Sequence, residues 1–206
     1  MKNSFSVIWF LSLPIAFGLL AISKTMVPWF FGDGYDKVAV LLSTFCWIVI
    51  PIGISSVTGS QYLVSTKRQA AYTISILIGA GVNFCMNIVL IPRAYSEGAA
   101  LASVTAEVVI ALVQVLYLTV VKKELNFGDV FLTAKHYVVA AVIMYVAVSL
   151  IAGKQKSAPI STMIQIAIGA LVYIAVLGFM RDNLLVSAVN KVKKVVDKNG
   201  FRGIKK

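Results

Sequence analysis

The sequence predicts an all-α fold, a polytopic bundle of six transmembrane helices. Of the 206 residues, 59% are hydrophobic and only 13% are charged, whereas about a quarter of the residues in a soluble domain are charged. The mean hydropathy is correspondingly high, at +0.89. The third observation is that the apolar residues gather in long runs bounded by charged residues. A helix needs about 20 mainly apolar residues to cross a hydrocarbon core of about 30 Å.

Six runs approach or meet this length. They cover residues 5–23, 38–59, 72–91, 98–121, 136–152 and 160–179. Spans of this kind are helical, because a backbone in lipid must satisfy its own hydrogen bonds and the runs lack the alternation of a barrel strand. We therefore expect a transmembrane region over residues 1–180 and a tail over residues 181–206.

The first run has an alternative interpretation as a cleaved signal peptide, because Lys2 precedes it and Ala21-Ile22-Ser23 resembles a cleavage site. The apolar part of a signal peptide is usually only about 7 to 15 residues long, so we expect a retained span. Pro14 in this run and Pro51 in the second remove backbone hydrogen bonds and predict kinks.

The third and fourth runs carry small and polar residues at helical spacing. In the third run these are Ser75, Gly79, Asn83 and Asn87. In the fourth they are Gly98, Ala102 and Ala106. Such faces point at protein or at a water-filled cavity rather than at lipid. From the sequence, these faces could either pack the two helices closely together or form the wall of a cavity.

Glu107 is the only acidic residue well inside a run. A carboxylate is costly in the bilayer, so its presence indicates a proton relay, a cation site or a brace to a neighbouring helix. We place Glu107, Asn83 and Asn87 on a candidate cavity or substrate path.

The basic residues divide unequally between the two sides of the predicted membrane. Fourteen lie on one side: Lys2, Lys67, Arg68, Lys122, Lys123, Lys135, Arg181, Lys191, Lys193, Lys194, Lys198, Arg202, Lys205 and Lys206. Five lie on the other: Lys24, Lys37, Arg93, Lys154 and Lys156. By the positive-inside rule, the first side is cytoplasmic. We expect a plasma-membrane protein with both termini in the cytoplasm.

Two features of the cytoplasmic side are candidates for contact with anions. Gln61, Lys67 and Arg68 follow the second run and could meet a phosphate or an anionic lipid head group, although topology signalling alone also explains the two cations. In the tail, apolar residues at helical spacing alternate with lysines. This pattern fits either an amphipathic helix on an anionic leaflet or a solvated basic tail.

No catalytic motif is found. The sequence has no phosphate-binding Gly-rich loop, no Gly-x-Ser-x-Gly elbow and no paired His motif. Cys46 and Cys85 lie in the middle of apolar runs, and His136 is the only histidine, which does not fit a zinc site. We expect no enzyme activity, no cofactor, no metal and no nucleic-acid partner.

Four stretches together resemble one family. They are Leu13-Pro14-Ile15-Ala16-Phe17-Gly18, Phe30-Phe31-Gly32-Asp33-Gly34-Tyr35, Val82-Asn83-Phe84-Cys85-Met86-Asn87-Ile88-Val89-Leu90-Ile91-Pro92, and Glu97-Gly98-Ala99-Ala100-Leu101-Ala102-Ser103 with Ala106-Glu107. In this order they resemble the carboxyl-terminal part of the polysaccharide flippases. These are the O-antigen and capsule repeat-unit transporters of the multidrug/oligosaccharidyl-lipid/polysaccharide exporter superfamily. The resemblance covers about residues 5–118, and the last two helices fit the family's extra carboxyl-terminal pair.

The resemblance implies a two-lobed, MATE-like flippase fold that opens alternately to each side of the membrane. Members move an undecaprenyl-diphosphate-linked oligosaccharide to the outer leaflet, and usually have twelve to fourteen spans. It implies that a separate chain supplies the missing amino-terminal spans, and that helices five and six offer an apolar groove for the lipid tail. Asn83, Asn87, Pro92 and Glu107 match family positions as landmarks. A drug/cation antiporter that depends on Glu107, and an inactive fragment, are the alternatives.

Overall fold

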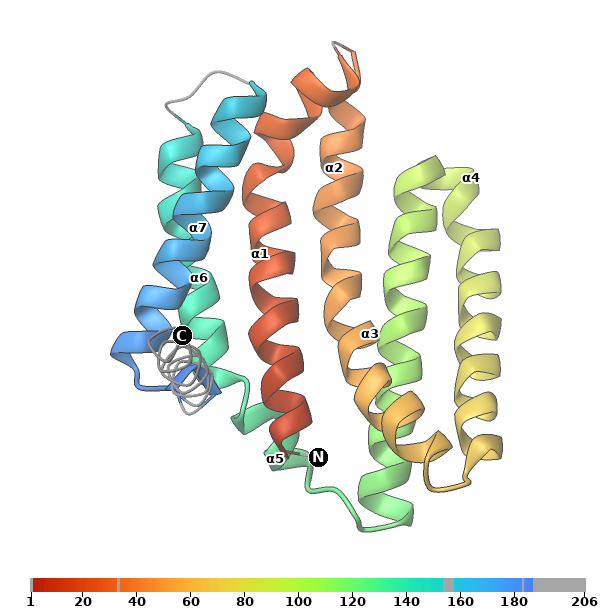
Figure 1. Cartoon of the computed structure of the whole chain (residues 1–206). Helices are drawn as coiled ribbons and strands as arrows, with labels where there is room; N and C mark the ends of the chain where they lie inside the picture. Colours follow the sequence, from red (N-terminus) through yellow and green to blue (C-terminus); the bar gives the residue numbers. More distant parts are fainter. Residues whose placement is uncertain (1, 33, 154–157, 183, 187–206) are drawn as a thin grey trace, which may run out of the picture.

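The structure is a computed structural model that describes residues 2–32, 34–153, 158–182 and 184–186. The described residues are almost entirely helical and contain no β-strand (Figure 1). The all-α prediction is therefore confirmed.

The first three spans contain both regular and irregular helix. The first is α1 (Lys2–Phe31). The second is assembled from α2 (Asp36–Phe45), the 3₁₀ segment η1 (Cys46–Ile48), α3 (Val49–Ser55) and the π-helical segment η2 (Ser56–Val64). The third is the first part of α4 (Gln69–Leu116). The 3₁₀ segment ends three residues before Pro51, within the turn that loses a backbone hydrogen bond to this proline. Helix α1, by contrast, continues without interruption through Pro14.

The fourth span is the second part of α4. This part is extended by the π-helical segment η3 (Tyr117–Val121). The short helix α5 (Phe127–Leu132) then leads into α6 (Lys135–Ala152), and α7 (Pro159–Phe179) is the last span. Helices therefore run beyond the predicted limits of most spans, because helical structure continues into polar residues at the membrane boundary, where hydropathy alone gives no signal.

Helix α4 and η3 together form two antiparallel spans. They give one apolar stretch, Gln69–Val121, of 53 residues, which would be about 80 Å long as a single helix and more than twice the thickness of the hydrocarbon core. At Tyr95 the backbone leaves the helical region, with φ 46° and ψ −123°, and the ribbon reverses there (Figure 1). Together with the other four long apolar helices, the two parts of α4 give the six predicted spans.

The bundle is arranged around α1. Helices α6 and α7 lie on one side of α1, and α2 and α3 lie on the other, followed by the α4 hairpin (Figure 1). Phe5 and Leu13 of α1 are buried in the core. The indole Nε1 of Trp9 donates to the Val130 carbonyl oxygen at 2.9 Å, which holds α5 against the first turns of α1.

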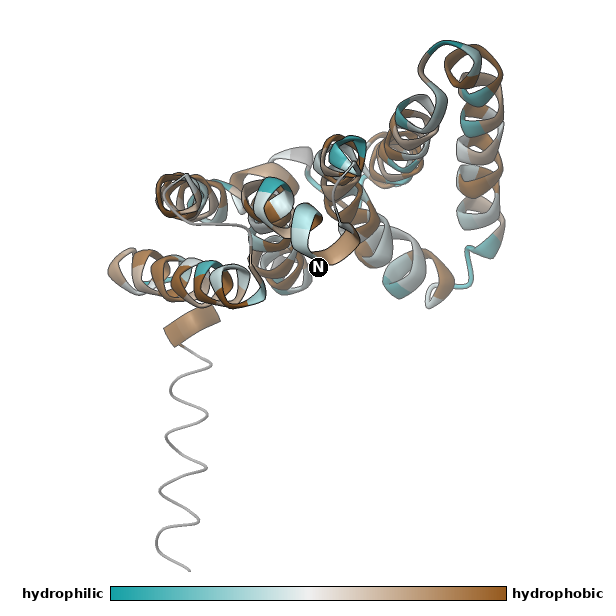
Figure 2. Cartoon of the chain, turned by 90° about the horizontal axis from the view of Figure 1, so that it is seen from above, coloured by the Kyte–Doolittle hydropathy of each residue, from teal (hydrophilic) through white to brown (hydrophobic). Residues whose placement is uncertain are grey.

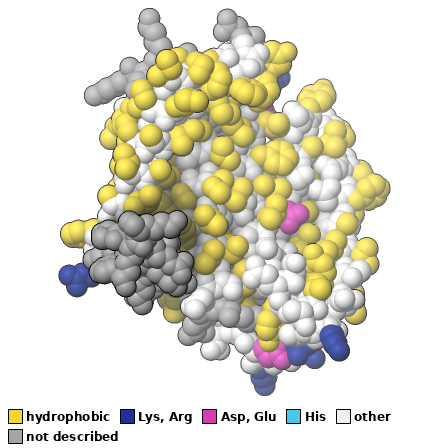
Figure 3. All heavy atoms as spheres, in the orientation of Figure 1, with side chains coloured by type: hydrophobic (Ala, Val, Ile, Leu, Met, Phe, Trp, Pro, Cys, Tyr) yellow, Lys and Arg dark blue, Asp and Glu magenta, His cyan; other side chains and the backbone are white. Residues whose placement is uncertain are grey.

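The outer surface of the bundle is apolar. Hydrophobic residues occur on every helix when the bundle is viewed along its axes (Figure 2), and hydrophobic side chains cover much of the face in Figure 3. Large side chains such as Leu77 and Leu171 are 65% and 69% exposed. Such a surface suits hydrocarbon rather than water. The chain is therefore a membrane-embedded, multi-pass protein.

One end of the bundle gathers the basic loops, and we call it the basic end. It holds the start of α1, the turn 65–68 after η2, the loop 122–126 after η3 and the end of α7 (Figure 1). The start of α1 and the end of α7 lie at the same end, as six crossings require. The expected amphipathic helix of the tail falls mostly on residues 187–206, outside the described residues.

Candidate functional site

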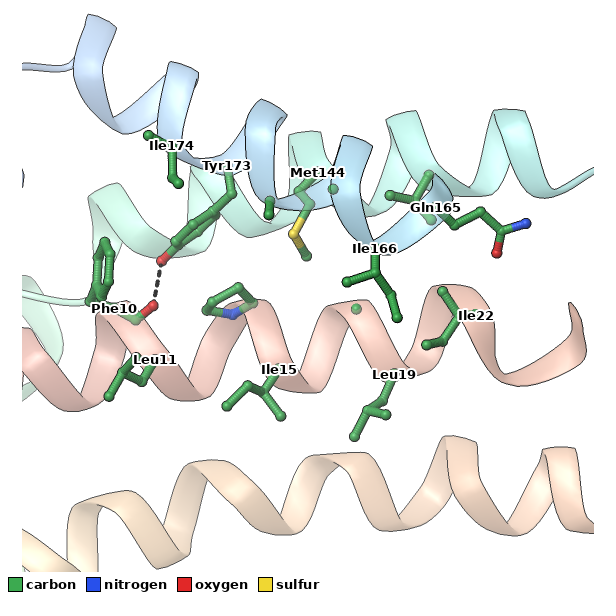
Figure 4. Close-up of a pocket in the computed structure, with 15 residues that line it drawn as sticks. Phe10, Leu11, Ile15, Leu19, Ile22, Met144, Gln165, Ile166, Tyr173 and Ile174 are labelled. Carbon is green, nitrogen blue, oxygen red and sulfur yellow. Dashed lines mark hydrogen bonds between the residues drawn. The ribbon is translucent and has the colours of Figure 1, made fainter. Parts of the chain in front are cut away.

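An apolar groove of about 410 Å³ runs between α1 and α7, with α6 as its floor (Figure 4). On the α1 side it is lined by Leu11, Ile15 and Leu19, among others, and on the α7 side by Ile166 and Ile174. Ile15 and Ile166 are about half exposed, at 47% and 55%. The groove is therefore open to the surrounding bilayer rather than enclosed.

The floor of the groove depends on close helix packing. Gly169 of α7 is buried, and a Cβ atom added there would lie 3.1 Å from Val148 Cγ2 of α6. The side chain of Met144, from α6, extends past α7 toward α1 (Figure 4), so that it lies near both Gly169 of α7 and Gly18 of α1. Small residues thus let the helices approach while the larger side chains form the apolar rims.

The polar groups beside the groove are engaged with other groups of the protein. Pro14 has no N–H, so it cannot bond the carbonyl of Phe10 four residues earlier. The hydroxyl of Tyr173, from α7, donates to this carbonyl oxygen at 3.1 Å (Figure 4). Further along the same interface, Thr25 Oγ1 donates to Gln165 Oε1 at 2.9 Å. These bonds fix α7 to α1 and leave a groove surface that is almost wholly apolar.

Removing the Tyr173 hydroxyl is expected to destabilise the α1–α7 contact. In Tyr173→Phe the Phe10 carbonyl loses its donor in an apolar environment, which costs about 1 to 2 kcal/mol. Adding Pro14→Ala supplies a backbone N–H to the same carbonyl, so the double variant should recover most of the lost unfolding free energy. Reversible unfolding in mixed micelles measures both variants. Equal stability of Tyr173→Phe and the unmodified protein would refute the role given to this bond.

The predicted amide residues lie inside the α4 hairpin. Asn87 Nδ2 donates to Asn83 Oδ1 at 2.8 Å, and Asn83 Nδ2 lies 3.5 Å from Ser103 Oγ on the opposite limb. Both asparagines are half-buried. The face that carries these asparagines therefore contributes to helix packing. The Oδ1 atom of Asn87 is buried and has no hydrogen-bond partner among the described residues. A role on a substrate path stays a prediction.

Glu107 lies in the second limb of the same hairpin, one turn after Ser103. It is half-buried within the span, and no ion pair or hydrogen bond of its carboxyl group is found in the part of the chain that the structure describes. Its predicted function also stays a prediction.

A hydrogen-bonded cluster that the sequence did not identify as a unit joins three spans. Gln114 is 1% exposed and Thr58 and Ser75 are fully buried. Thr58 Oγ1, from η2, donates to Gln114 Oε1 at 2.7 Å, and Gln114 Nε2 donates to Ser75 Oγ at 2.9 Å. Gln114 is on the second limb of α4 and Ser75 on the first, so one amide links the hairpin to the second span.

The three predicted residues at the basic end have different environments. Gln61 and Lys67 are exposed, whereas Arg68 forms a two-pronged ion pair with Glu124. Its Nη1 contacts Oε2, and its Nη2 donates to Oε1 at 2.8 Å. Tyr62 also donates to Glu124 Oε2, at 3.0 Å. Arg68 is therefore a tie between the turn 65–68 and the loop 122–126 rather than a free anion-binding group.

The ion pair sets the ionisation of its members. The Arg68 guanidinium, followed by the Tyr62 hydroxyl, lowers the pKa of Glu124 from 4.5 to about 2. In turn, the Glu124 carboxylate raises the pKa of Arg68. Both groups are charged at neutral pH.

Acidification is expected to weaken this tie. Because the pKa of Glu124 is lower in the folded protein than in the unfolded chain, its contribution is fully present above pH 4.5 and is lost as the pH falls towards about 2. The thermal midpoint of the unmodified protein should fall in this window, and Glu124→Gln should lack that component of the fall. Glu97→Gln, an exposed carboxyl at the opposite end, is the control. A Glu124→Gln profile parallel to that of the unmodified protein would contradict the assignment.

The structure does not bring the sequence-predicted residues into one site. Asn83, Asn87 and Glu107 belong to the α4 hairpin, whereas Gln61 and Lys67 are at the basic end. Among the described residues there is no group of three His, Cys, Asp or Glu side chains that could hold a metal ion. The resemblance implied an apolar groove at the last two spans, and the groove found in the described part of the chain also involves α1.

The fold and its surface define a class of protein, a helical membrane protein with six crossings and a lateral apolar groove. Comparison with protein families, curated proteins and solved structures gives no match.

Proposed function

We propose that this chain supplies six helices of a membrane transporter for a lipid-linked oligosaccharide, a flippase of cell-surface polysaccharide biosynthesis. The observation that carries the proposal is the apolar groove between α1 and α7. The order of motifs that resembles the polysaccharide flippases supplies the substrate class, an undecaprenyl-diphosphate-linked oligosaccharide.

Such a substrate makes two opposite demands on a transporter. Its isoprenoid tail is stable in hydrocarbon, whereas its diphosphate and sugars need a polar path across the bilayer. The groove meets the first demand, because it is open to the bilayer and its neighbouring polar groups on Tyr173 and Gln165 bond within the protein. The tail can therefore lie against apolar side chains without leaving a polar group unsatisfied.

The polar path is the second part of the proposal. Asn83, Asn87 and Glu107 are its candidate residues within the hairpin, and Gln61 and Lys67 are candidates where the substrate enters at the basic end. A separate chain that supplies further amino-terminal spans would complete the cavity for alternating access. In this proposal the protein lies in the plasma membrane with the basic end in the cytoplasm.

The test fills the groove while leaving its surroundings unchanged. Ala170 lines the groove, whereas Leu171, the next residue along α7, is 69% exposed and does not. In cells that depend on this locus, Ala170→Trp should abolish the appearance of the oligosaccharide on the outer leaflet, and Leu171→Trp should leave it unchanged. Normal flipping by Ala170→Trp, at equal abundance in the membrane, would contradict the proposal.

A Glu107→Gln variant distinguishes the drug/cation antiporter of the same superfamily. The antiporter would be favoured if Glu107→Gln abolished ion-driven drug export while Ala170→Trp left that export unchanged. A coupling carboxyl is essential to such a transport cycle. The lipid-linked substrate predicts the reverse dependence, with the groove variant giving the larger loss.

A further inference from the structure

At the basic end, three helices are each followed by a basic residue whose backbone lies in the left-handed region. These residues are Lys67 (φ 59°), Lys123 (φ 55°) and Arg181 (φ 51°). They follow the second, fourth and sixth spans. Among the described residues, the only other non-glycine with positive φ is Tyr95, at the opposite end.

The backbone hydrogen bonds identify this position as the residue just after the helix. Arg68 N–H donates to the Leu63 carbonyl at 2.8 Å and Lys67 N–H to that of Val64 at 3.1 Å, the pair of bonds that defines a Schellman motif. Arg181 and Asp182 form the same pair of bonds after α7, with Gly178 and Leu177, and Lys123 lies within a wider version of the turn.

Glycine is the usual residue at this position, because a Cβ atom is unfavourable in left-handed backbone. The opposite end of the bundle follows that rule. After α1, Gly32 has φ 90° and its N–H donates to the Pro28 carbonyl at 3.1 Å. The negative end of the helix dipole favours a cation anywhere in the last turn, so it does not explain why the cation occupies the one position that favours glycine.

The charge of the neighbouring side chains indicates what the cations meet. Lys67, Lys122 and Lys123 are exposed and belong to the same two segments as Arg68 and Glu124, whose charges compensate one another. Three positive charges therefore remain uncompensated within this cluster. Basic side chains gather at this lower edge, directly beneath the hydrophobic surface (Figure 3).

The level of the cluster in the membrane follows from the spans. The second apolar stretch ends at Val64 and the third ends at Val121, so the three lysines lie where hydrocarbon gives way to lipid head groups. Lys122 Nζ lies 5.7 Å from the centroid of the Tyr117 ring, and tyrosine is typical of this boundary.

We propose that Lys67, Lys122 and Lys123 form a binding site for the phosphate groups of anionic bilayer lipids. The left-handed positions of Lys67 and Lys123 hold these two cations at the head-group level, in return for a less favourable backbone than glycine would give. Lys67 is also a candidate for substrate entry in the proposed function, but the lipid site goes beyond that function, because it binds bilayer lipid when no substrate is present.

The test compares nanodiscs of phosphatidylcholine alone with nanodiscs of equal parts phosphatidylcholine and phosphatidylglycerol. Three double variants of Lys67 and Lys123 separate charge from backbone strain, with both residues changed to Gly, to Gln or to Arg. Each cation near the surface contributes about fivefold to the affinity for anionic lipid. The Gly and Gln pairs should therefore bind spin-labelled phosphatidylglycerol about 25-fold less well, while the Arg pair retains binding.

Thermal unfolding supplies a second readout, in which backbone strain and lipid binding change the midpoint in opposite directions. In phosphatidylcholine alone the Gly pair should have a higher midpoint than the unmodified protein, because left-handed strain is relieved, yet it should lose the gain that phosphatidylglycerol gives. Undiminished gain in the Gly and Gln pairs would overturn the proposal. So would an equal loss in Lys37→Gln at the opposite end, or the same gain from inorganic phosphate added to phosphatidylcholine nanodiscs.

Discussion

Gly98→Val is expected to destabilise the protein by about 3 kcal/mol or more, because its new Cβ atom would lie where the backbone of the other limb already is. A Cβ atom at Gly98 would lie 2.5 Å from the Leu90 carbonyl oxygen and 2.7 Å from the carbonyl carbon. A flexible side chain could turn away, but a helical backbone cannot. The two limbs of α4 would have to separate near Tyr95.

Gly81→Val is the matched control for this change. Both glycines lie in α4, and an added Cβ atom at Gly81 meets nothing within 4 Å. The two substitutions therefore add the same β-branched side chain to α4 and differ in the space available to it. Unfolding in mixed micelles should show the large loss at Gly98 alone. Equal effects of the two changes would mean that the limbs do not approach as described.

Gln114→Leu is expected to cost about 2 to 4 kcal/mol of unfolding free energy, although leucine is the more apolar residue. The change leaves the Thr58 hydroxyl and the Ser75 hydroxyl without their amide partner in a fully buried position. Each orphaned polar group costs about 1 to 3 kcal/mol, and less where the hydroxyl also bonds its own helix. Here both do so, with the Ile54 and Tyr72 carbonyls.

A triple variant separates lost bonding from lost packing. With Thr58→Val and Ser75→Ala added to Gln114→Leu, no orphaned side-chain group remains, so most of the lost stability should return. The measurement is the unfolding free energy of the single and triple variants in the same micelles. A triple variant less stable than Gln114→Leu alone would show that the orphaned hydroxyl groups do not cause the loss of stability.

Hydropathy was sufficient to predict the six spans, because their length and apolar character reflect the bilayer directly. It could not predict how sharply the chain reverses at Tyr95. The bend has no Gly at its centre, and the two nearest helix breakers, Pro92 and Gly98, lie three residues to either side of Tyr95. Nor could it predict that the helix after α1 would extend from Asp36 to Val64 through 3₁₀ and π segments, because these depend on packing.

The contacts between distant residues were beyond sequence reasoning for a different reason. Arg68 and Glu124 are 56 positions apart, and Tyr173 and Phe10 are 163 apart, so no local spacing links them. The face that carries Asn83, by contrast, was predictable, because helical periodicity alone places it toward another part of the protein.

Two crossings of the membrane by α4 give the chain six spans rather than five. Single cysteines at Lys67, Tyr95 and Lys123, in protein with Cys46 and Cys85 replaced by alanine, can be labelled in sealed vesicles with an impermeant maleimide. If α4 crosses twice, Lys67→Cys and Lys123→Cys react from the same side and Tyr95→Cys reacts from the other. Reaction of Lys67→Cys and Lys123→Cys from opposite sides would contradict the double crossing.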